Sequence, residues 1–185
     1  MNALSKPFQP FTSAEIHKMA RRGAFDDIRV ELRRGMLVKM RPKHVRHIQV
    51  QADLAFALGL AIRAAGLSWR VGNDGTVSYG QGFDPAPEIV VFDPVLLTDA
   101  EGPLSPVSVK LIVEVADTSL NDDLGEKRED YARFGLVEYW LADVNAKVVH
   151  MHAEPKNGAL ARMTTVNLTD PLAMLTQPNI VAQIA

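Results

Sequence analysis

The chain has 185 residues, of which 47% are hydrophobic and 23% are charged, and its formal net charge is -2. These values are typical of a globular domain, and the length suits one domain over residues 1–185. No run approaches the roughly 20 apolar residues that a membrane span needs, and the N-terminal residues lack the apolar core of a secretory signal. The absence of cysteine excludes disulfides and thiolate metal sites. We therefore expect a cytoplasmic protein without membrane contact.

Charge is distributed unevenly along the chain. Residues 1–46 carry a formal net charge of +7, whereas residues 47–185 carry -9. A basic segment beside an acidic body suits a protein that approaches a phosphate backbone while its acidic part holds cations. Ordinary surface charge accounts for the same numbers equally well. The charge pattern therefore permits nucleic-acid binding but does not demonstrate it.

The first third of the chain predicts an arm, a helix, a hairpin and a long helix. Pro7 and Pro10 predict an irregular arm over residues 1–12. A short helix should begin at Thr12 or Ser13 and run to about residue 22. Residues 28–40 read as a hairpin that turns at 34–35. Apolar residues at three- and four-residue spacing then predict a long helix over residues 44–65.

The remaining two thirds predict strands and one further helix. Residues 109–115 are nearly all apolar, which is typical of a central strand covered on both faces. We expect a helix over residues 121–134 and a loop over 97–106. Further strands are expected at 69–71, 76–78, 88–92, 136–144, 148–153 and 161–166, followed by a loose C-terminal end. This order predicts an α/β chain of the α+β type, with a mixed β-sheet flanked by helices.

Glu114 is an acidic residue in the apolar strand VKLIVEV. An unpaired carboxylate in a core strand costs several kcal/mol, so this side chain must be paired, exposed at the strand end or bound to a metal. Glu88 repeats the pattern one strand earlier. If the two strands are neighbours, both carboxylates can converge at one edge of the sheet. Two carboxylates with water and substrate oxygens are a usual way of holding Mg²⁺ or Mn²⁺ for phosphoryl chemistry.

Lys127 lies on the helix that follows the Glu114 strand. From there its amine can reach the strand end, orient the attacking water or stabilise developing charge. Taken alone, each of these residues has a plainer interpretation: a surface lysine for Lys127, and an exposed strand-start acid for Glu88. Asp123 serves equally well as a helix cap. Six basic residues are candidates for phosphate contact, namely Arg33, Arg34, Lys39, Arg41, Lys43 and Arg46.

The central third of the sequence resembles a known family. The stretch PEIVVF…KLIVEVADTSLNDDLGEKREDYARFGLVEYWLADV is similar to the Uma family of restriction-endonuclease-type proteins, a branch of the PD-(D/E)XK nuclease superfamily. Glu114 falls on the family's Glu, Asp123 and Lys127 on its Asp and Lys, and Tyr131 on its Tyr. Glu31 matches the Glu of an early hairpin, and His47 a helical His. The likeness covers most of residues 25–150.

This resemblance implies a restriction-endonuclease-like fold and metal-dependent cleavage of DNA, with Glu88 and Glu114 as metal ligands and Lys127 as the catalytic amine. Glu31, His47 and Asp123 become possible supporting residues. A homodimer is plausible, because nucleases of this type often pair to cut two strands.

Two departures from the family pattern keep a second hypothesis open. Glu88 stands where the family carries Asp, and the loop 116–119 differs from the family's Ser-Pro-Ser-Thr. Ala116 also occupies the usual lysine position of the Glu-x-Lys strand, so that Lys127 must supply the amine. The alternative is a nuclease fold that no longer cuts and serves as a binding or assembly module.

Overall fold

The fold is built on a mixed β-sheet. The computed structural model describes residues 9–97, 99, 101–117 and 123–184. Within these ranges, six strands form the sheet in the order β3-β4-β5-β6-β7-β8. Only the β5–β6 pair among them is parallel. The strands are β3 (Arg70–Asn73), β4 (Ile89–Phe92), β5 (Val109–Ala116), β6 (Glu138–Asp143), β7 (Val148–Lys156) and β8 (Ala159–Asn167). The expected α/β architecture with a mixed sheet is confirmed.

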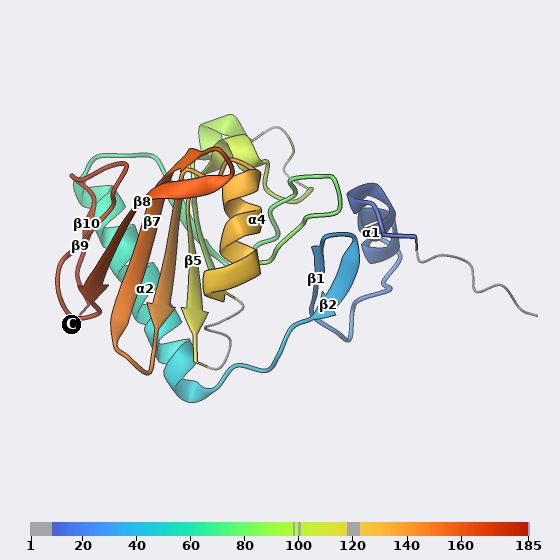
Figure 1. Cartoon of the computed structure of the whole chain (residues 1–185). Coiled ribbons are helices and arrows are strands. Elements are labelled where there is room, and N and C mark those ends of the chain that lie inside the picture. Colours follow the sequence, from blue (N-terminus) through green and yellow to red (C-terminus); the bar gives the residue numbers. More distant parts are fainter. Residues whose placement is uncertain (1–8, 98, 100, 118–122, 185) are drawn as a thin grey trace, which may run out of the picture.

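Helices cover both faces of the sheet, with α2 (Val45–Ala64) on one side and α4 (Arg128–Arg133) on the other (Figure 1). Leu54 and Leu58 of α2 share a buried cluster with Val113 of β5. Tyr131 of α4 belongs to a second cluster, on the opposite face, with Ile112. Because β5 is apolar toward both helices, it is the central strand that its sequence predicted. Each fully buried aliphatic side chain there contributes about 1.5–3 kcal/mol.

The N-terminal part forms a helix and a separate hairpin beside the sheet (Figure 1). Helix α1 (Ser13–Ala20) begins at Thr12, which forms a capping box with Glu15. Strands β1 (Val30–Arg33) and β2 (Met36–Lys39) pair antiparallel. Arg34 and Gly35 both have positive φ, as a two-residue hairpin turn requires. These elements confirm the expected helix and hairpin.

Two elements in the middle of the chain differ from expectation. Residues 76–78 form no strand; Val77 makes a single bridge to Leu104. The helix expected over 121–134 is divided into a π-helical turn, η3 (Asp123–Lys127), and α4, because Gly125 has a non-helical backbone with φ -91° and ψ -112°. Residues 121 and 122 lie outside the described part. The loop after β4 is flanked by two 3-10 turns, η1 (Pro94–Leu96) and η2 (Pro106–Ser108).

The C-terminal end is ordered, so the expectation of a loose end was wrong. Strands β9 (Leu172–Ala173) and β10 (Val181–Ala182) pair with each other. Leu172, Met174 and Ile180 are buried in the cluster on the α2 side of the sheet. The segment is held because its apolar side chains complete that core. In the described residues, no helix is long and apolar enough to cross a membrane.

Candidate active site

Glu114 lies on the face of β5 that is turned toward α4. Side chains alternate along a strand, so Val113 and Val115 face α2 while Glu114 faces the opposite side. There its Oε1 accepts a hydrogen bond from the hydroxyl of Tyr131 at 2.9 Å and lies 2.8 Å from Nζ of Lys127. Only 1% of Glu114 is exposed. The carboxylate that the sequence marked as misplaced is therefore buried and paired.

Glu88 lies beside Glu114, as expected for neighbouring strands. The antiparallel register pairs Ile89 with Val113, and one further step along both strands brings Glu88 alongside Glu114. Oε2 of Glu88 accepts a hydrogen bond from the backbone N–H of Val115 at 3.2 Å. The two carboxyl groups are also hydrogen-bonded to each other. The structure thus brings both predicted acids together at one edge of the sheet.

Lys127 reaches this edge from the end of η3, where it is 6% exposed. Besides Glu114, its Nζ contacts Oε2 of Glu31 at 3.6 Å. Glu31 is buried on β1 and accepts a hydrogen bond from the backbone N–H of Ala86 at 3.4 Å. The hairpin glutamate and the helix lysine, which are 96 positions apart, meet in one cluster with Glu114.

Burial controls the protonation of this cluster. It is the largest of the effects that together raise the pKa of Glu114 to about 8, opposed by Lys127 and assisted by Glu88. The phenol pKa of Tyr131 is raised well above its usual value, again chiefly by burial and then by Glu114. Tyr131 therefore stays protonated and donates its hydrogen bond. Glu114 retains a proton at neutral pH unless a cation replaces it.

His47 and Gln51 approach the cluster from α2. Nε2 of His47 lies 3.6 Å from Oε1 of Glu88 and makes no hydrogen bond to any described residue. Burial lowers the pKa of His47, followed by the effect of Lys43, so its ring is neutral at pH 7. One turn further along the helix, Nε2 of Gln51 donates to the backbone carbonyl of Glu88 at 2.8 Å. Helix α2 thus contacts both the side chain and the backbone of Glu88.

The donor set fits a hard divalent cation. Carboxylate oxygens from Glu88 and Glu114 converge, and Mg²⁺ is commonly bound through one or two carboxylates, with water and substrate phosphate as its other ligands. No group of three or more His, Cys, Asp or Glu side chains that could enclose a metal exists among the described residues. A divalent cation bound by these two carboxylates would need water and a substrate oxygen as its remaining ligands. The side chain of Asp123 lies outside the description, so its supporting role stays a prediction.

Five of the six basic residues predicted to contact phosphate divide into two groups, and Arg34 is described below. Lys39, Arg41 and Arg46 are exposed. Arg33 is buried, with its guanidinium 4.0 Å from the Glu31 carboxylate. Lys43 hydrogen-bonds Gln51 at 2.9 Å and forms an ion pair with Asp74. The first three are available to a ligand, whereas Arg33 and Lys43 support residues around the cluster.

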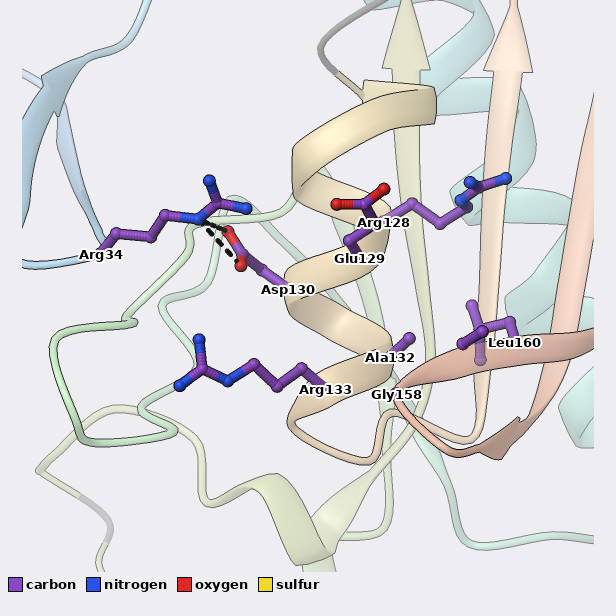
Figure 2. A pocket seen from close by; sticks show the side chains of 9 residues that line it. Arg34, Arg128, Glu129, Asp130, Ala132, Arg133, Gly158 and Leu160 are labelled. Carbon is purple, nitrogen blue, oxygen red and sulfur yellow. Dashed lines mark hydrogen bonds and ion pairs between the residues drawn. The ribbon is translucent and has the colours of Figure 1, made fainter.

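Arg34 links the hairpin to the helix that follows the cluster. Its Nε lies 3.1 Å from both carboxylate oxygens of Asp130, which is buried on α4 (Figure 2). A second contact, 3.2 Å, joins its guanidinium to Glu126. The pair borders a hollow of about 520 Å³ beside α4, which is also lined by Arg128 and Arg133. Arg34 therefore fixes the β1–β2 turn against the helix that carries Tyr131.

Sequence reasoning missed two polar residues near these elements. Gln51 was missed because its helix was predicted from the spacing of apolar residues. Its position one turn from His47 nevertheless places both on one helix face. Asp84 is buried, and its Oδ1 accepts hydrogen bonds from Ser13 at 2.9 Å and from Ser78 at 2.8 Å. Its position in the proline-rich segment FDPAPE gave no sign of these long-range contacts.

The buried carboxyl pair and the lysine thus lie together at the ends of two neighbouring strands in a mixed sheet flanked by helices. The chain belongs to the family whose model, Uma2, is described as "Putative restriction endonuclease" and matches residues 13–185. A solved structure with a similar fold is that of "a putative nuclease belonging to DUF820" from Anabaena variabilis. It has a TM-score of 0.67 and 10% sequence identity, and the match covers 84% of this chain and 86% of that one. No curated protein matches the chain.

Proposed function

We propose that this protein is a metal-dependent DNA endonuclease of the PD-(D/E)XK type, which hydrolyses phosphodiester bonds. The observation that carries the proposal is the buried cluster in which Glu88, Glu114 and Lys127 meet. A buried Glu114 with a raised pKa is poorly suited to a purely structural role, because replacing it by an apolar residue would relieve the cost of burial. Its retention is explained if a cation takes the place of its proton.

In this proposal Glu88 and Glu114 hold Mg²⁺ or Mn²⁺. When bound, the metal would act as a Lewis acid on the phosphate and lower the pKa of a water molecule. The Val115 backbone N–H holds one oxygen of Glu88 in place, and the Tyr131 hydroxyl holds one oxygen of Glu114. These two contacts fix the orientation of the acids before substrate arrives. Such preorganisation is what makes a polar site effective in catalysis.

Lys127 supplies the amine of the site. Its Nζ lies 2.8 Å from Oε1 of Glu114 in a buried environment, where electrostatic interactions are stronger than in water. Its positive charge stabilises the negative charge that develops on the phosphate oxygens during attack by water. Oε2 of Glu31 lies 3.6 Å from the amine and is the second carboxylate beside it. Ala116 stands where a Glu-x-Lys strand would place its lysine, and Lys127 takes over that role from η3.

DNA would approach over the exposed basic residues Lys39, Arg41 and Arg46. They lie at the end of the hairpin, on the connection to α2 and in its first turn, and so precede the helix that contacts Glu88. Contacts to phosphate by such residues bind without regard to sequence and weaken as salt increases. The proposed substrate is therefore a DNA backbone, and no preferred sequence is part of the proposal.

The decisive experiment compares Mn²⁺ binding and plasmid nicking in two variants. Glu114→Ala should retain the fold but lose both metal binding, measured by titration calorimetry, and metal-dependent nicking of supercoiled DNA. Glu129→Ala is the matched control, because Glu129 is an exposed acid on α4. Equal nicking by Glu114→Ala would overturn the proposal. A wild-type chain that neither binds Mn²⁺ nor nicks DNA would instead support the alternative, a fold that only binds or assembles.

A further inference from the structure

Helix α4 carries two arginines that make no ion pair with any described residue. Residues 47–185 contain only nine Lys and Arg residues, and three of these lie within 127–133. Lys127 points into the acid cluster, whereas Arg128 is half-buried and Arg133 is exposed. Neither arginine forms a salt bridge or donates a hydrogen bond within the described part of the chain. The acidic part of the sequence thus places two unpaired positive charges on one short helix.

Both arginines line the hollow of about 520 Å³ beside α4. Figure 2 shows that their side chains leave the helix on different sides, with Arg128 on the side of Leu160 and Arg133 on the side of Arg34. The two residues are five positions apart, which is about 8 Å along the helix axis. Their guanidinium groups therefore suit two separate phosphate groups of one chain and not a single small anion.

The acids near these arginines do not pair with them. Asp130 and Glu126 are both engaged by Arg34, at 3.1 and 3.2 Å. The other acid of α4, Glu129, is exposed and forms no salt bridge with a residue that the structure describes. The guanidinium of Arg133 lies over the ring of Phe134 instead, 5.6 Å from its centroid. The charges of Arg128 and Arg133 are therefore available to an anion from solution.

The two arginines and Arg46 lie on opposite faces of the sheet. Helix α4 covers one face, and α2, whose first turn carries Arg46, covers the other (Figure 1). The cluster of Glu114 and Lys127 lies between the two helices at the edge of the sheet. Arg128 directly follows Lys127, so their Cα atoms are about 3.8 Å apart. A DNA chain whose phosphate reaches the cluster can therefore contact basic side chains on both faces of the sheet.

From these observations we infer that α4 is a second contact surface for the DNA backbone, on which Arg128 and Arg133 each bind one phosphate group. The inference rests on the proposed function, which supplies DNA as the ligand. Guanidinium groups bind phosphate oxygens through parallel N–H donors. Such contacts hold the duplex in place without reading its sequence. Arg34 has a different role, because Asp130 and Glu126 already balance its charge.

The test measures DNA affinity as a function of salt concentration. A short fluorescein-labelled duplex is titrated with the full chain in EDTA, so that no cleavage occurs, and binding is followed by fluorescence anisotropy. Arg128→Gln and Arg133→Gln each remove one positive charge. Arg63→Gln is the matched control, because Arg63 is an exposed arginine in the last turn of α2. It lies roughly 25 Å along that helix from the turn that carries Arg46.

Each arginine variant should lower the slope of log affinity against log salt by about one, and the double variant should lower it by about two. The double variant should also bind DNA about tenfold more weakly at low salt, whereas Arg63→Gln should match wild type in both measurements. Arg128→Lys keeps the charge and should keep the slope. The inference is overturned if Arg128→Gln and Arg133→Gln behave like Arg63→Gln. Because Arg133 is exposed, Arg133→Gln carries the test even if Arg128→Gln does not fold.

Free inorganic phosphate is the other source of the same chemistry. It is titrated into the full chain while the Nε–Hε NMR signals of Arg128 and Arg133, assigned from the two Gln variants, are followed. Signals that move with the duplex at far lower concentration than with inorganic phosphate support the DNA backbone as the ligand. Saturation by phosphate alone, together with an unchanged salt slope for DNA in the double variant, would assign the hollow to a free anion and overturn the inference.

The outcomes separate this inference from the proposed nuclease activity. If the arginine variants bind DNA like Arg63→Gln while wild type nicks DNA with Mn²⁺, the nuclease proposal stands and the α4 surface is rejected. If the salt slope falls as expected but wild type does not nick DNA with Mn²⁺ or Mg²⁺, the α4 surface stands and the nuclease proposal fails.

Discussion

Two buried glutamates at opposite ends of neighbouring parallel strands show how the same residue type serves two purposes. Glu114 lies near the end of β5 and Glu138 at the start of β6, and both are at most 1% exposed. Glu138 accepts hydrogen bonds from the Trp140 indole and the Leu175 backbone, both at 2.7 Å. Its other oxygen accepts from the backbone and the hydroxyl of Thr176 at 2.8 and 2.6 Å. These four donors are all uncharged groups.

Glu114 has a different environment, because its neighbours are themselves ionisable. A lysine, a tyrosine hydroxyl and a second carboxyl group surround it, and its pKa is raised to about 8. The donors around Glu138 hold the C-terminal segment to the sheet, so its task is structural. In the proposed function, a metal cation takes the place of the proton of Glu114. Burial alone therefore does not mark a site, whereas burial among titratable neighbours does.

The largest expected effect comes from removing the lysine beside Glu114. Lys127→Met should lower metal-dependent nicking about a thousandfold, equivalent to about 4 kcal/mol of transition-state stabilisation. Mn²⁺ binding by calorimetry should persist or strengthen, since a positive charge next to the acids is gone. Lys127→Arg keeps the charge and should restore part of the rate. Unchanged nicking in Lys127→Met would remove the amine from the mechanism.

A pH series tests the role of Glu114 through the free energy of unfolding. Because the folded pKa of Glu114 lies above its unfolded value of 4.5, the folded state keeps a proton that the unfolded state releases. Stability from this group is complete below about pH 4.5 and is lost as pH rises through about 8. In EDTA, the free energy of unfolding of wild type should fall by about 3 kcal/mol between pH 5 and 8 relative to Glu114→Gln. Urea unfolding at each pH measures it.

Adding Mn²⁺ provides the control for that series. A bound cation substitutes for the proton, so in wild type the fall in the free energy of unfolding at high pH should be smaller with Mn²⁺ than in EDTA. The pH profile of Glu114→Gln should be the same with and without Mn²⁺. Parallel pH profiles for the two proteins in EDTA would show that Glu114 is not the source of the effect.

Removing Glu138 should lower stability and leave metal binding unchanged. Glu138→Ala leaves four donors, among them the buried Trp140 indole, without their acceptor and should lower stability by about 2–3 kcal/mol, visible as a lower thermal midpoint. The C-terminal segment should then become accessible to proteases, because Leu175 and Thr176 lose their anchor. Mn²⁺ affinity at the distant cluster should match wild type. A fall in metal affinity as large as that caused by Glu114→Ala would mean that the two ends of the sheet are not independent.

The sequence predicted much of the fold because its strongest signals are local. The apolar run at 109–115, the hairpin turn at 34–35 and the spacing along residues 44–65 each specify an element without reference to distant residues. Errors arose where long-range contacts decide the structure. The C-terminal end is ordered because Leu172 and Ile180 complete a core that forms elsewhere, and Val77 is buried without belonging to a strand.

The candidate site was predictable to a similar degree. Glu114 and Glu88 could be paired because an acid within or next to an apolar strand requires an explanation. The match to the family pattern singled out Lys127, and without it a helix lysine carries no signal. Glu138 lies in the same stretch as the family-matched residues, but only the structure shows that it holds the chain end instead of a ligand. Gln51 could not be recognised, because its partner is a backbone carbonyl and backbone atoms leave no trace in sequence.

Gln51 offers the smallest and most specific test, because its amide contacts the backbone of Glu88 and not the carboxylate. Its side chain donates at 2.8 Å to the Glu88 carbonyl, and Lys43 donates to Gln51 at 2.9 Å, so the amide is held at both ends. Gln51→Leu keeps the size and the helix but releases this support, while the Asp74 backbone N–H still reaches the same carbonyl at 3.1 Å. Partners of metal ligands typically account for 10–100-fold in metal affinity. We expect about tenfold weaker Mn²⁺ binding by calorimetry.

The control for this prediction is Gln49→Leu, an exposed position on the same helix, which should bind Mn²⁺ like wild type. If Gln51→Leu also binds normally while folding to the same stability, the hydrogen bond merely fills a polar gap in the interior. If the affinity falls as expected, Gln51 acts as a positioning residue, because a loss of Mn²⁺ affinity without a loss of stability means that the amide orients Glu88. The difference between Glu138 and Glu114 would then extend to their neighbours. Those around Glu138 hold the fold together, and those around Glu88 and Glu114 hold the two acids in their orientation.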